Sequence, residues 1–337
     1  MKTLLVGYRA ADLFEKGRHG KSATASWLTP DVTCHTLDIY HRHAIEKVHH
    51  AKAICSPHLP EGPWDVIRFK TGPKLMPGEL SLDLLQECAK LVGGEMRPPR
   101  FVMDFEGKER DRNDLLDKIK DYPQRIRDFA ATWTASVPGG PQLAFTSFPG
   151  CFCHRRQDEG GLALAEVVAH DLGSETAASS QQPAASVKFL DMGCGCGLVG
   201  FLVASAFGSQ TPKQPNNPNT PLIELVSVDS HTRAVEATEL NSKNFGIPAE
   251  VILSDGGTPA RMDGTFDVFA GNPPYYSDYR IADVFLQTAR RALKPGGVCY
   301  TVCKNAAGLE PVQREYFPEV EIINRRGYSV LKSVKPS

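Results

Sequence analysis

The tetrapeptide Asn272-Pro273-Pro274-Tyr275 follows an apolar run at 266–270 and combines rigid backbone with hydrogen-bonding side chains. Pro273 and Pro274 each fix φ at about −65° and restrict the residue before them, so Asn272 is held in one geometry. The Asn272 side-chain oxygen and neighbouring backbone carbonyls can accept the hydrogens of a planar NH2 group. Tyr275 can stack on the ring that carries such an amine. The motif therefore predicts a site that holds an exocyclic amine.

A glycine-rich loop lies upstream, where the apolar run Phe189-Leu190-Asp191-Met192 leads into Gly193-Cys194-Gly195-Cys196-Gly197. The three loop glycines, Gly193, Gly195 and Gly197, can adopt positive φ and allow the backbone to approach a ligand without a Cβ in the way. The N-terminus of the helix expected after the loop offers free N–H groups to a carboxylate or phosphate. The sequence therefore predicts a ligand site here.

Three aspartates extend this site. Asp229 follows the apolar run 223–228 and is placed to accept hydrogen bonds from two ribose hydroxyls. Asp255 follows the run 250–253 and can accept a hydrogen bond from an adenine amine. Asp191, before the loop, can orient the loop and face a cationic amino-acid group. A ligand with ribose, adenine and an amino-acid end is S-adenosylmethionine.

The run Gly195-x-Gly197-x-x-Gly200 also fits the dinucleotide fingerprint, which is followed by an acidic residue. The interval from Gly197 to Asp229 is longer than the usual spacing of about 20 residues, but a polar insert at 209–221 accounts for the excess. Asp191 favours S-adenosylmethionine, because a dinucleotide site would place a pyrophosphate beside it. A glycine turn with no ligand is the structural alternative.

The two motifs together predict methyl transfer to nitrogen. Transfer from a sulfonium is an in-line displacement in which charge is lost, so it depends on alignment, which can contribute on the order of 7 kcal/mol. No separate catalytic triad is expected. The predicted catalytic residues are Asn272, Pro273, Pro274 and Tyr275. The predicted cofactor-binding residues are Asp191, Gly193, Gly195, Gly197, Asp229, Asp255 and Asn272.

The elements around these motifs alternate between strand and helix from Val187 onward. Strands are predicted at 187–192, 223–228, 250–253, 266–270 and 298–302, and helices at 198–207, 232–245 and 281–293, the last ended by Pro295-Gly296-Gly297. This alternation predicts an α/β fold with a parallel sheet, helices on both faces, and ligands at the carboxyl ends of the strands.

The first half repeats this order, with strands predicted at 2–7, 32–39 and 64–69 and a helix at 81–92 before Gly93-Gly94. We interpret this as a diverged internal duplication. It predicts two tandem Rossmann-like domains, 1–135 with a charged linker helix within 104–129, and 136–337. The first domain has no glycine loop after Leu4-Leu5-Val6-Gly7, and Lys70-Thr71-Gly72-Pro73 stands in place of Asn272–Tyr275, so it is predicted to be degenerate. The segments 174–186 and 209–221 are predicted to be exposed loops.

Composition indicates an ordinary soluble protein of 337 residues, with 41% hydrophobic and 23% charged residues. The net charge is −1, so any nucleic-acid contact must come from a local basic patch. No apolar run has the length of a membrane span or of a secretory signal, which predicts a cytoplasmic protein. The nine cysteines are expected to be free thiols, and neither they nor the ten histidines form a convincing metal motif.

Six basic residues are candidates for RNA contacts because they flank the predicted site: Arg155, Arg156, Arg280, Lys304, Arg325 and Arg326. Each taken alone is more typical of an ordinary surface charge. Their grouping near the predicted strand ends favours an RNA-binding role.

The second half resembles class I S-adenosylmethionine-dependent N-methyltransferases. The whole chain resembles the RsmC-like family of small-subunit ribosomal RNA guanine-N2 methyltransferases, in which a degenerate first domain precedes an active second one. The resemblance rests on Phe148-Pro149-Gly150-Cys151-Phe152-Cys153 and the helix-like 161–170, on Asn272–Tyr275 in place of Asn-Pro-Pro-Phe, and on Arg325-Arg326-Gly327-Tyr328-Ser329-Val330. It covers the second half well and the first 135 residues in outline.

The resemblance implies that guanine N2 of ribosomal RNA is methylated. The substrate would be either the RNA itself or the small ribosomal subunit that contains it. Two alternatives remain open. Asn-Pro-Pro-Tyr is also found in adenine-N6 and protein glutamine methyltransferases, and a module that binds the cofactor without turnover would keep the same pocket. The residues by themselves imply only a planar amine.

Overall fold

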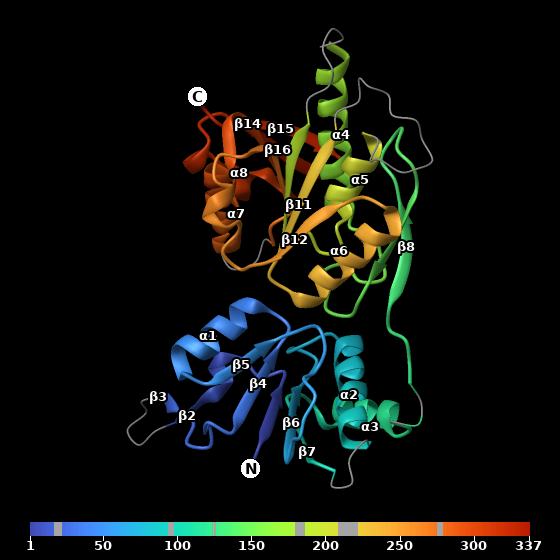
Figure 1. Cartoon of the computed structure of the whole chain (residues 1–337), viewed down its shortest axis with the longest axis vertical. Helices are drawn as coiled ribbons and strands as arrows, with labels where there is room; N and C mark the ends of the chain where they lie inside the picture. Colours follow the sequence, from blue (N-terminus) through green and yellow to red (C-terminus); the bar gives the residue numbers. More distant parts are fainter. Residues whose placement is uncertain are drawn as a thin grey trace. The chain divides into compact units, whose positions relative to one another are not determined.

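A computed structural model describes residues 1–16, 22–93, 98–122, 124, 126–178, 186–207, 222–274 and 279–337. The chain divides into two compact units, each with its own sheet (Figure 1). The first unit comprises Met1–Ala130 with Phe148–Gly150 and His231–Arg233, and the second comprises Ala131–Ser147, Cys151–Ser230 and Ala234–Ser337. The chain passes into the second unit at Ala131, shortly before the boundary predicted between residues 135 and 136, because the strand that begins there pairs with a later strand of the second unit.

The first unit contains a five-stranded parallel sheet in the order β5-β4-β1-β6-β7. Its elements are β1 (Thr3–Val6), the 3-10 helix η1 (Ala10–Leu13), β2 (Phe14–Lys16), β3 (Ser22–Thr24), β4 (Val32–Thr36), α1 (Ile39–His49), β5 (Lys52–Cys55), β6 (Val66–Thr71), α2 (Gly78–Gly93), β7 (Arg100–Phe105) and α3 (Glu109–Ile119).

Both faces of this sheet are buried, as expected for parallel strands. Leu4 and Val6 of β1 pack with Leu84 and Leu85 of α2 on one face. Leu5 faces the other way and packs with Ile45 of α1. The two-residue alternation of a strand therefore supplies both layers of the core, with α1 on one face and α2 and α3 on the other (Figure 1).

The second unit contains a seven-stranded sheet in the order β12-β11-β10-β13-β14-β16-β15. Its elements are β8 (Ala131–Ala135), β9 (Leu143–Ser147), α4 (Glu159–Ala178), β10 (Val187–Met192), α5 (Leu198–Ala206), β11 (Ile223–Asp229), α6 (Thr232–Phe245), β12 (Ala249–Leu253), the 3-10 helix η2 (Ala260–Met262), β13 (Phe266–Gly271), α7 (Arg280–Ala292), β14 (Leu293–Cys303), α8 (Ala306–Tyr316), β15 (Glu321–Arg325) and β16 (Tyr328–Val334).

The first five strands of this order are parallel, and β16 and β15 then add an antiparallel edge. Helices α4, α5 and α6 lie on one side of the sheet, and α7 and α8 lie on the other (Figure 1). The predicted α/β class with two tandem Rossmann-like sheets is confirmed. All nine cysteines are free thiols, and no helix among the described residues has the length and apolar character of a membrane span.

Two local predictions were wrong. The helix before β14 ends at Ala292, and Pro295-Gly296-Gly297 lies inside β14 rather than between a helix and a strand. The strand continues there because Gly296 donates its N–H to Lys335 and Gly297 accepts from Lys335. Residues 174–178, predicted as a loop, form the last turns of α4. The remainder of that segment, 179–185, and the insert 209–221 lie outside the described residues.

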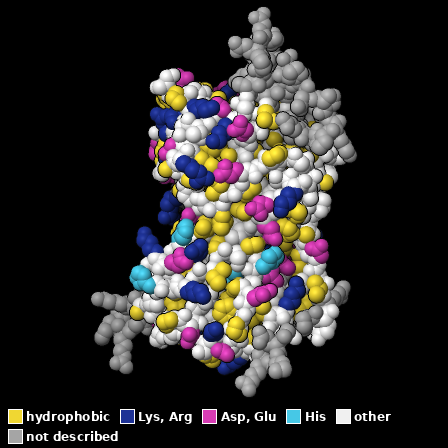
Figure 2. Space-filling model, in the orientation of Figure 1, with side chains coloured by type: hydrophobic (Ala, Val, Ile, Leu, Met, Phe, Trp, Pro, Cys, Tyr) yellow, Lys and Arg dark blue, Asp and Glu magenta, His cyan; other side chains and the backbone are white. Residues whose placement is uncertain are grey.

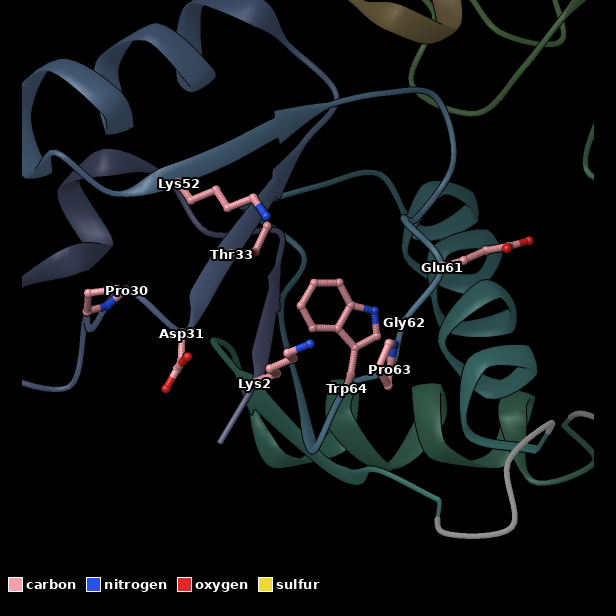
Figure 3. A pocket seen from close by; sticks show the side chains of 9 residues that line it. All are labelled: Lys2, Pro30, Asp31, Thr33, Lys52, Glu61, Gly62, Pro63 and Trp64. Atoms are coloured by element: carbon pink, nitrogen blue, oxygen red, sulfur yellow. The ribbon is translucent and has the colours of Figure 1, made fainter.

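A cavity of about 240 Å³ lies in the first unit at the amino ends of its strands (Figure 3). Its lining includes the indole of Trp64 together with Lys2, Asp31, Lys52 and Glu61. Open α/β sheets bind their ligands outside the carboxyl ends of the strands. The cavity is therefore at the wrong end of the sheet for the cofactor, and it is not part of the predicted site.

Candidate active site

The strand register of the second unit brings the two predicted motifs together. Met192, the last residue of β10, pairs with Gly271, the last residue of β13. The glycine loop therefore starts at Gly193 and the amine motif at Asn272 from matched positions of neighbouring strands. Such strands lie about 4.8 Å apart. The loop and Asn272 thus leave the sheet side by side at its carboxyl edge.

The glycine loop has the backbone that its composition predicts. Gly193, Gly195 and Gly197 have φ values of +69°, +59° and +84°, which favour glycine. A Cβ at Gly193 would lie 2.7 Å from the Phe285 ring, and one at Gly197 would lie 2.3 Å from the Phe201 ring, so both positions are closed by packing. A Cβ at Gly195 would meet no described atom within 4 Å. Gly195 therefore leaves open space beside the backbone, which gives room for a ligand to approach closely.

Polar contacts fix this loop from two neighbouring elements. The Gly193 N–H donates to Val228 O over 2.8 Å, and the Gly195 N–H donates to Asp229 Oδ2 over 2.9 Å. From α6, Thr238 Oγ1 donates to Gly195 O and Asn241 Nδ2 donates to Cys196 O, each over 2.9 Å. Both side chains are completely buried.

Thr238 and Asn241 were not predicted as functional. The signal was present in the sequence, since they are polar residues at core-facing positions of an amphipathic helix. A buried amide at such a position must find hydrogen-bond partners, and here its partners include the cofactor loop.

Asp191 is buried at 2% exposure, and its Oδ2 accepts a hydrogen bond from the Gly200 N–H over 3.0 Å. Burial, with a smaller contribution from the negative charge of Asp229, raises the pKa of Asp191 to about 7. A cationic group nearby would favour the ionised carboxylate. Asp191 therefore both orients the loop–helix junction and is suited to a cationic ligand end.

The other two predicted acidic residues lie at the same edge of the sheet. Asp229 ends β11, and its backbone carbonyl accepts from the Ser254 N–H over 2.9 Å. Asp255 follows Ser254, just beyond the end of β12. These positions suit contacts with the ribose and adenine parts of a cofactor, and both roles remain predictions.

Asn272 directly follows β13, and its side chain has a partner that the sequence reasoning missed. Asn272 Nδ2 donates to Asp158 Oδ2 over 2.6 Å. Asp158 immediately precedes α4 and also accepts from the Gly160 and Gly161 N–H groups at 3.3 and 2.7 Å, as an N-cap residue does. Pro273 is buried and Pro274 is partly buried. Tyr275 lies outside the described residues.

The six basic candidates lie around this carboxyl edge. Arg155 and Arg156 precede Asp158, Arg280 begins α7, Lys304 follows β14, Arg325 ends β15, and Arg326 begins the turn to β16. Glu166 of α4 is an ion-pair partner of both Arg325 and Arg326, and Arg326 also lies 3.4 Å from Glu159. Lys304 Nζ lies 4.2 Å from the centroid of the Tyr328 ring.

These pairings reduce the net positive charge of the group. Figure 2 likewise shows basic and acidic side chains interspersed on the visible surface. The assignment of these residues to RNA remains a prediction.

The glycine loop and Asn272 follow neighbouring strands at the carboxyl edge of a Rossmann-like sheet. This arrangement is typical of cofactor-dependent transferases of the methyltransferase class. The family model for the methyltransferase small domain matches residues 142–332. The chain therefore belongs to this family, and its cofactor is S-adenosylmethionine.

Comparison with curated proteins identifies relatives of low identity. The chain is 25% identical over 225 residues to ribosomal RNA small subunit methyltransferase C of Pseudomonas syringae, covering 65% of this chain and 59% of the relative. It is 29% identical over 202 residues to the protein of that name from Pseudoalteromonas translucida, covering 59% and 51%. The chain thus spans just over half the length of these relatives.

Among solved structures, the chain is similar to a Thermus thermophilus 16S rRNA N2 G1207 methyltransferase (RsmC) in complex with AdoMet and guanosine. The TM-score is 0.71 at 17% identity, covering 99% of this chain and 88% of that one. This similarity supports the two-domain fold. Together, the comparisons show an S-adenosylmethionine-dependent methyltransferase related to the RsmC proteins.

Proposed function

We propose that the second unit transfers a methyl group to an exocyclic amine of RNA, and that this amine is guanine N2 of small-subunit ribosomal RNA. The observation that carries the proposal is the Met192–Gly271 register pair, after which the glycine loop and Asn272 leave neighbouring strands. One loop suits the cofactor and the other suits a flat amine, so a donor and an acceptor can meet at one edge of the sheet.

The choice of guanine N2 rests on the relatives. Two of them are named as small-subunit ribosomal RNA methyltransferases, and the similar solved structure contains AdoMet and guanosine. As part of the same proposal, the reaction takes place in the cytoplasm. The six basic residues around the site would contribute a few phosphate contacts, with affinity that falls as salt rises.

The cofactor residues would divide the work of binding. Asp229 would bind the ribose hydroxyls, Asp255 the adenine amine and Asp191 the cationic amino-acid end, and the 193–197 backbone would allow close approach. When bound, S-adenosylmethionine supplies a methyl group on a positively charged sulfur.

The acceptor residues would align the amine. Because Asn272 Nδ2 already donates to Asp158, the Oδ1 atom is the part of this amide that accepts a hydrogen from the substrate amine. In this proposal the carbonyl of Pro273 accepts the second hydrogen. With both hydrogens held in the plane of the ring, the nitrogen lone pair points out of that plane toward the methyl donor.

Modified-nucleoside mapping tests this proposal. Small-subunit RNA would be isolated from cells with and without the protein, digested, and compared by mass spectrometry. We expect N2-methylguanosine at one position to disappear with the protein and to return when the wild-type chain is restored. Loss of N6-methyladenosine instead would assign the chain to adenine, and an unchanged nucleoside profile would contradict an RNA substrate.

A further inference from the structure

Asp158 makes contacts that link the start of α4 to the acceptor site. Its Oδ2 accepts from Gly161 N–H at 2.7 Å and from Asn272 Nδ2 at 2.6 Å, while Oδ1 accepts from Gly160 N–H at 3.3 Å and lies 3.9 Å from Cys153 Sγ. One carboxylate therefore caps a helix and contacts the amide that follows β13.

The contact with Asn272 determines which end of the amide faces the substrate. An asparagine amide has a donor end and an acceptor end of nearly the same size, so packing alone selects weakly between them. A carboxylate accepts hydrogen bonds and cannot donate one when ionised. Asp158 therefore stabilises the orientation in which Nδ2 points toward Asp158 and Oδ1 points away from it.

We propose that Asp158 is a positioning residue that keeps Asn272 Oδ1 directed at the substrate amine. This inference deepens the proposed function and rests on it, because the role of Asn272 in transfer is itself proposed. Asp158 acts through Asn272 and contacts neither substrate nor cofactor in this assignment. The wrong amide orientation would present an NH2 group to an NH2 group, which cannot form the hydrogen bond.

Gly160 has no side chain at the point where the start of α4 packs against Tyr328 and Asn272. A Cβ at Gly160 would lie 3.2 Å from the Tyr328 ring and 3.6 Å from Asn272 Nδ2. The first distance is tighter than ordinary van der Waals contact, so a methyl group there would press on Tyr328, with Asn272 immediately beside it. An alanine within α4 should nevertheless favour the helix, since alanine has the higher helix propensity.

Three full-length variants separate positioning from helix capping. Asp158→Ser keeps a hydroxyl that can cap α4 but is too short to reach Asn272 as well. Asp158→Asn keeps one carbonyl oxygen for both Gly161 and Asn272. Gly160→Ala leaves Asp158 in place and changes the packing beside Asn272.

Each variant would be assayed for transfer of a labelled methyl group to naked small-subunit RNA and to assembled small subunits. We expect Asp158→Ser to lower kcat roughly 10-fold to 100-fold, with KM, cofactor affinity and melting temperature nearly unchanged. Asp158→Asn should restore kcat to within about 5-fold of wild type. Gly160→Ala should lower kcat severalfold without lowering the melting temperature.

Native kcat in Asp158→Ser would overturn the positioning role while leaving the proposed function intact. A fall in melting temperature and cofactor affinity that parallels the loss of kcat would show that Asp158 acts only as a helix cap. Absence of turnover in the wild-type chain would instead contradict the proposed function.

Crystal structures of the wild type and of Asp158→Ser provide a readout that does not depend on turnover. We expect the Asn272 amide to change its orientation in the variant. An Asn272 amide with the same hydrogen-bond partners in both structures, apart from residue 158, would overturn the inference.

Discussion

The two units share one sheet order and differ at the ends of the strands. The order β5-β4-β1-β6-β7 of the first unit corresponds strand by strand to β12-β11-β10-β13-β14 of the second. The register corresponds as well, since Val6 pairs with Phe69 in the first unit as Met192 pairs with Gly271 in the second. Lys70 therefore occupies the position of Asn272.

At that position the first unit has a pair of ionic contacts. Lys70 Nζ lies 2.6 Å from Asp12 Oδ1 and 2.5 Å from Glu106 Oε1. Nearby, Arg68 makes a bidentate pair with Asp104, which also accepts from the Tyr8 hydroxyl. Gly7 alone corresponds to the glycine loop, and its Cβ position is closed at 2.3 Å by Lys70 O.

This difference distinguishes the residues that specify the fold from the residues that form the candidate site. Paired buried strands and covering helices are present in both units, so they specify the fold. The glycine loop, the acidic residues at the strand ends and the rigid amide are present in the second unit. Methyl transfer should therefore depend on the second set, and the variants below test that division in order of expected effect.

The largest contrast is expected between Asn272→Ala and Lys70→Ala, which truncate corresponding positions. Asn272→Ala should lower methyl transfer by about 100-fold or more, because the amine is no longer aligned. Cofactor affinity should fall far less than transfer, because the glycine loop and the three aspartates remain. Lys70→Ala should leave transfer per folded molecule within about twofold of wild type. Equal losses in a labelled-methyl assay would show that the two units do not differ as described.

Asp229→Ala should weaken cofactor binding by ~1–3 kcal/mol, because the variant removes an acceptor near the ribose and the partner of the Gly195 N–H. Calorimetry with S-adenosylmethionine measures the change. The wild-type chain should bind one cofactor. Two sites per wild-type chain would mean that the first unit also binds, and unchanged affinity in the variant would reject the ribose assignment.

The raised pKa of Asp191, about 7, predicts a pH dependence of both binding and stability. A cationic cofactor end favours the carboxylate, so wild-type affinity should fall as pH decreases below about 7, by up to about 10-fold per pH unit. Asp191→Asn should show weaker binding without this slope. Calorimetry from pH 5 to pH 8 checks both curves, and parallel curves would remove Asp191 from cofactor binding.

The contribution of Asp191 to the stability of the cofactor-free protein should instead become more favourable as pH decreases from about 7 to about 4. The folded carboxyl has a higher pKa than the unfolded one, so its burial costs progressively more as pH rises from about 4 to about 7 and then a constant amount. Without cofactor, Asp191→Asn should therefore melt at a higher temperature than wild type at pH 8, by roughly 2–4 °C for each kcal/mol gained. At pH 4 the two proteins should melt alike.

The smallest effect is expected for the stability of Lys70→Ala. Removing the ammonium leaves Asp12, whose side chain is 18% exposed, without this partner. We expect a loss of about 1–2 kcal/mol, since the second partner, Glu106, is 57% exposed and solvent reduces its contribution. Urea unfolding measures it. A loss in cofactor affinity rather than stability would give Lys70 a functional role.

The sequence predicted the sheet, the duplication and the strand-end motifs because their signals are local. Apolar runs specify buried strands, and glycines and prolines mark the turns between them. The same rule failed at Pro295-Gly296-Gly297, where pairing with Lys335 outweighs the turn signal.

The sequence could not reveal partners that are distant along the chain. Asp158 meets Asn272 across 114 positions, and Asn241 contacts Cys196 O across 45. The core-facing position of Asn241 can be read from the sequence, but the loop that it contacts cannot, and nothing local distinguishes Asp158 from an ordinary helix-capping residue. Such residues become recognisable once the register of β10 and β13 places the two loops at one edge.

Transfer of a trideuterated methyl group from labelled S-adenosylmethionine to small-subunit RNA tests the account most directly. After digestion, we expect wild-type protein to yield trideuterated N2-methylguanosine, the Lys70→Ala variant to yield nearly as much, and the Asn272→Ala variant to yield almost none. Equal labelling by the wild type and Asn272→Ala would contradict the central claim that the amide after β13 aligns the accepting nitrogen.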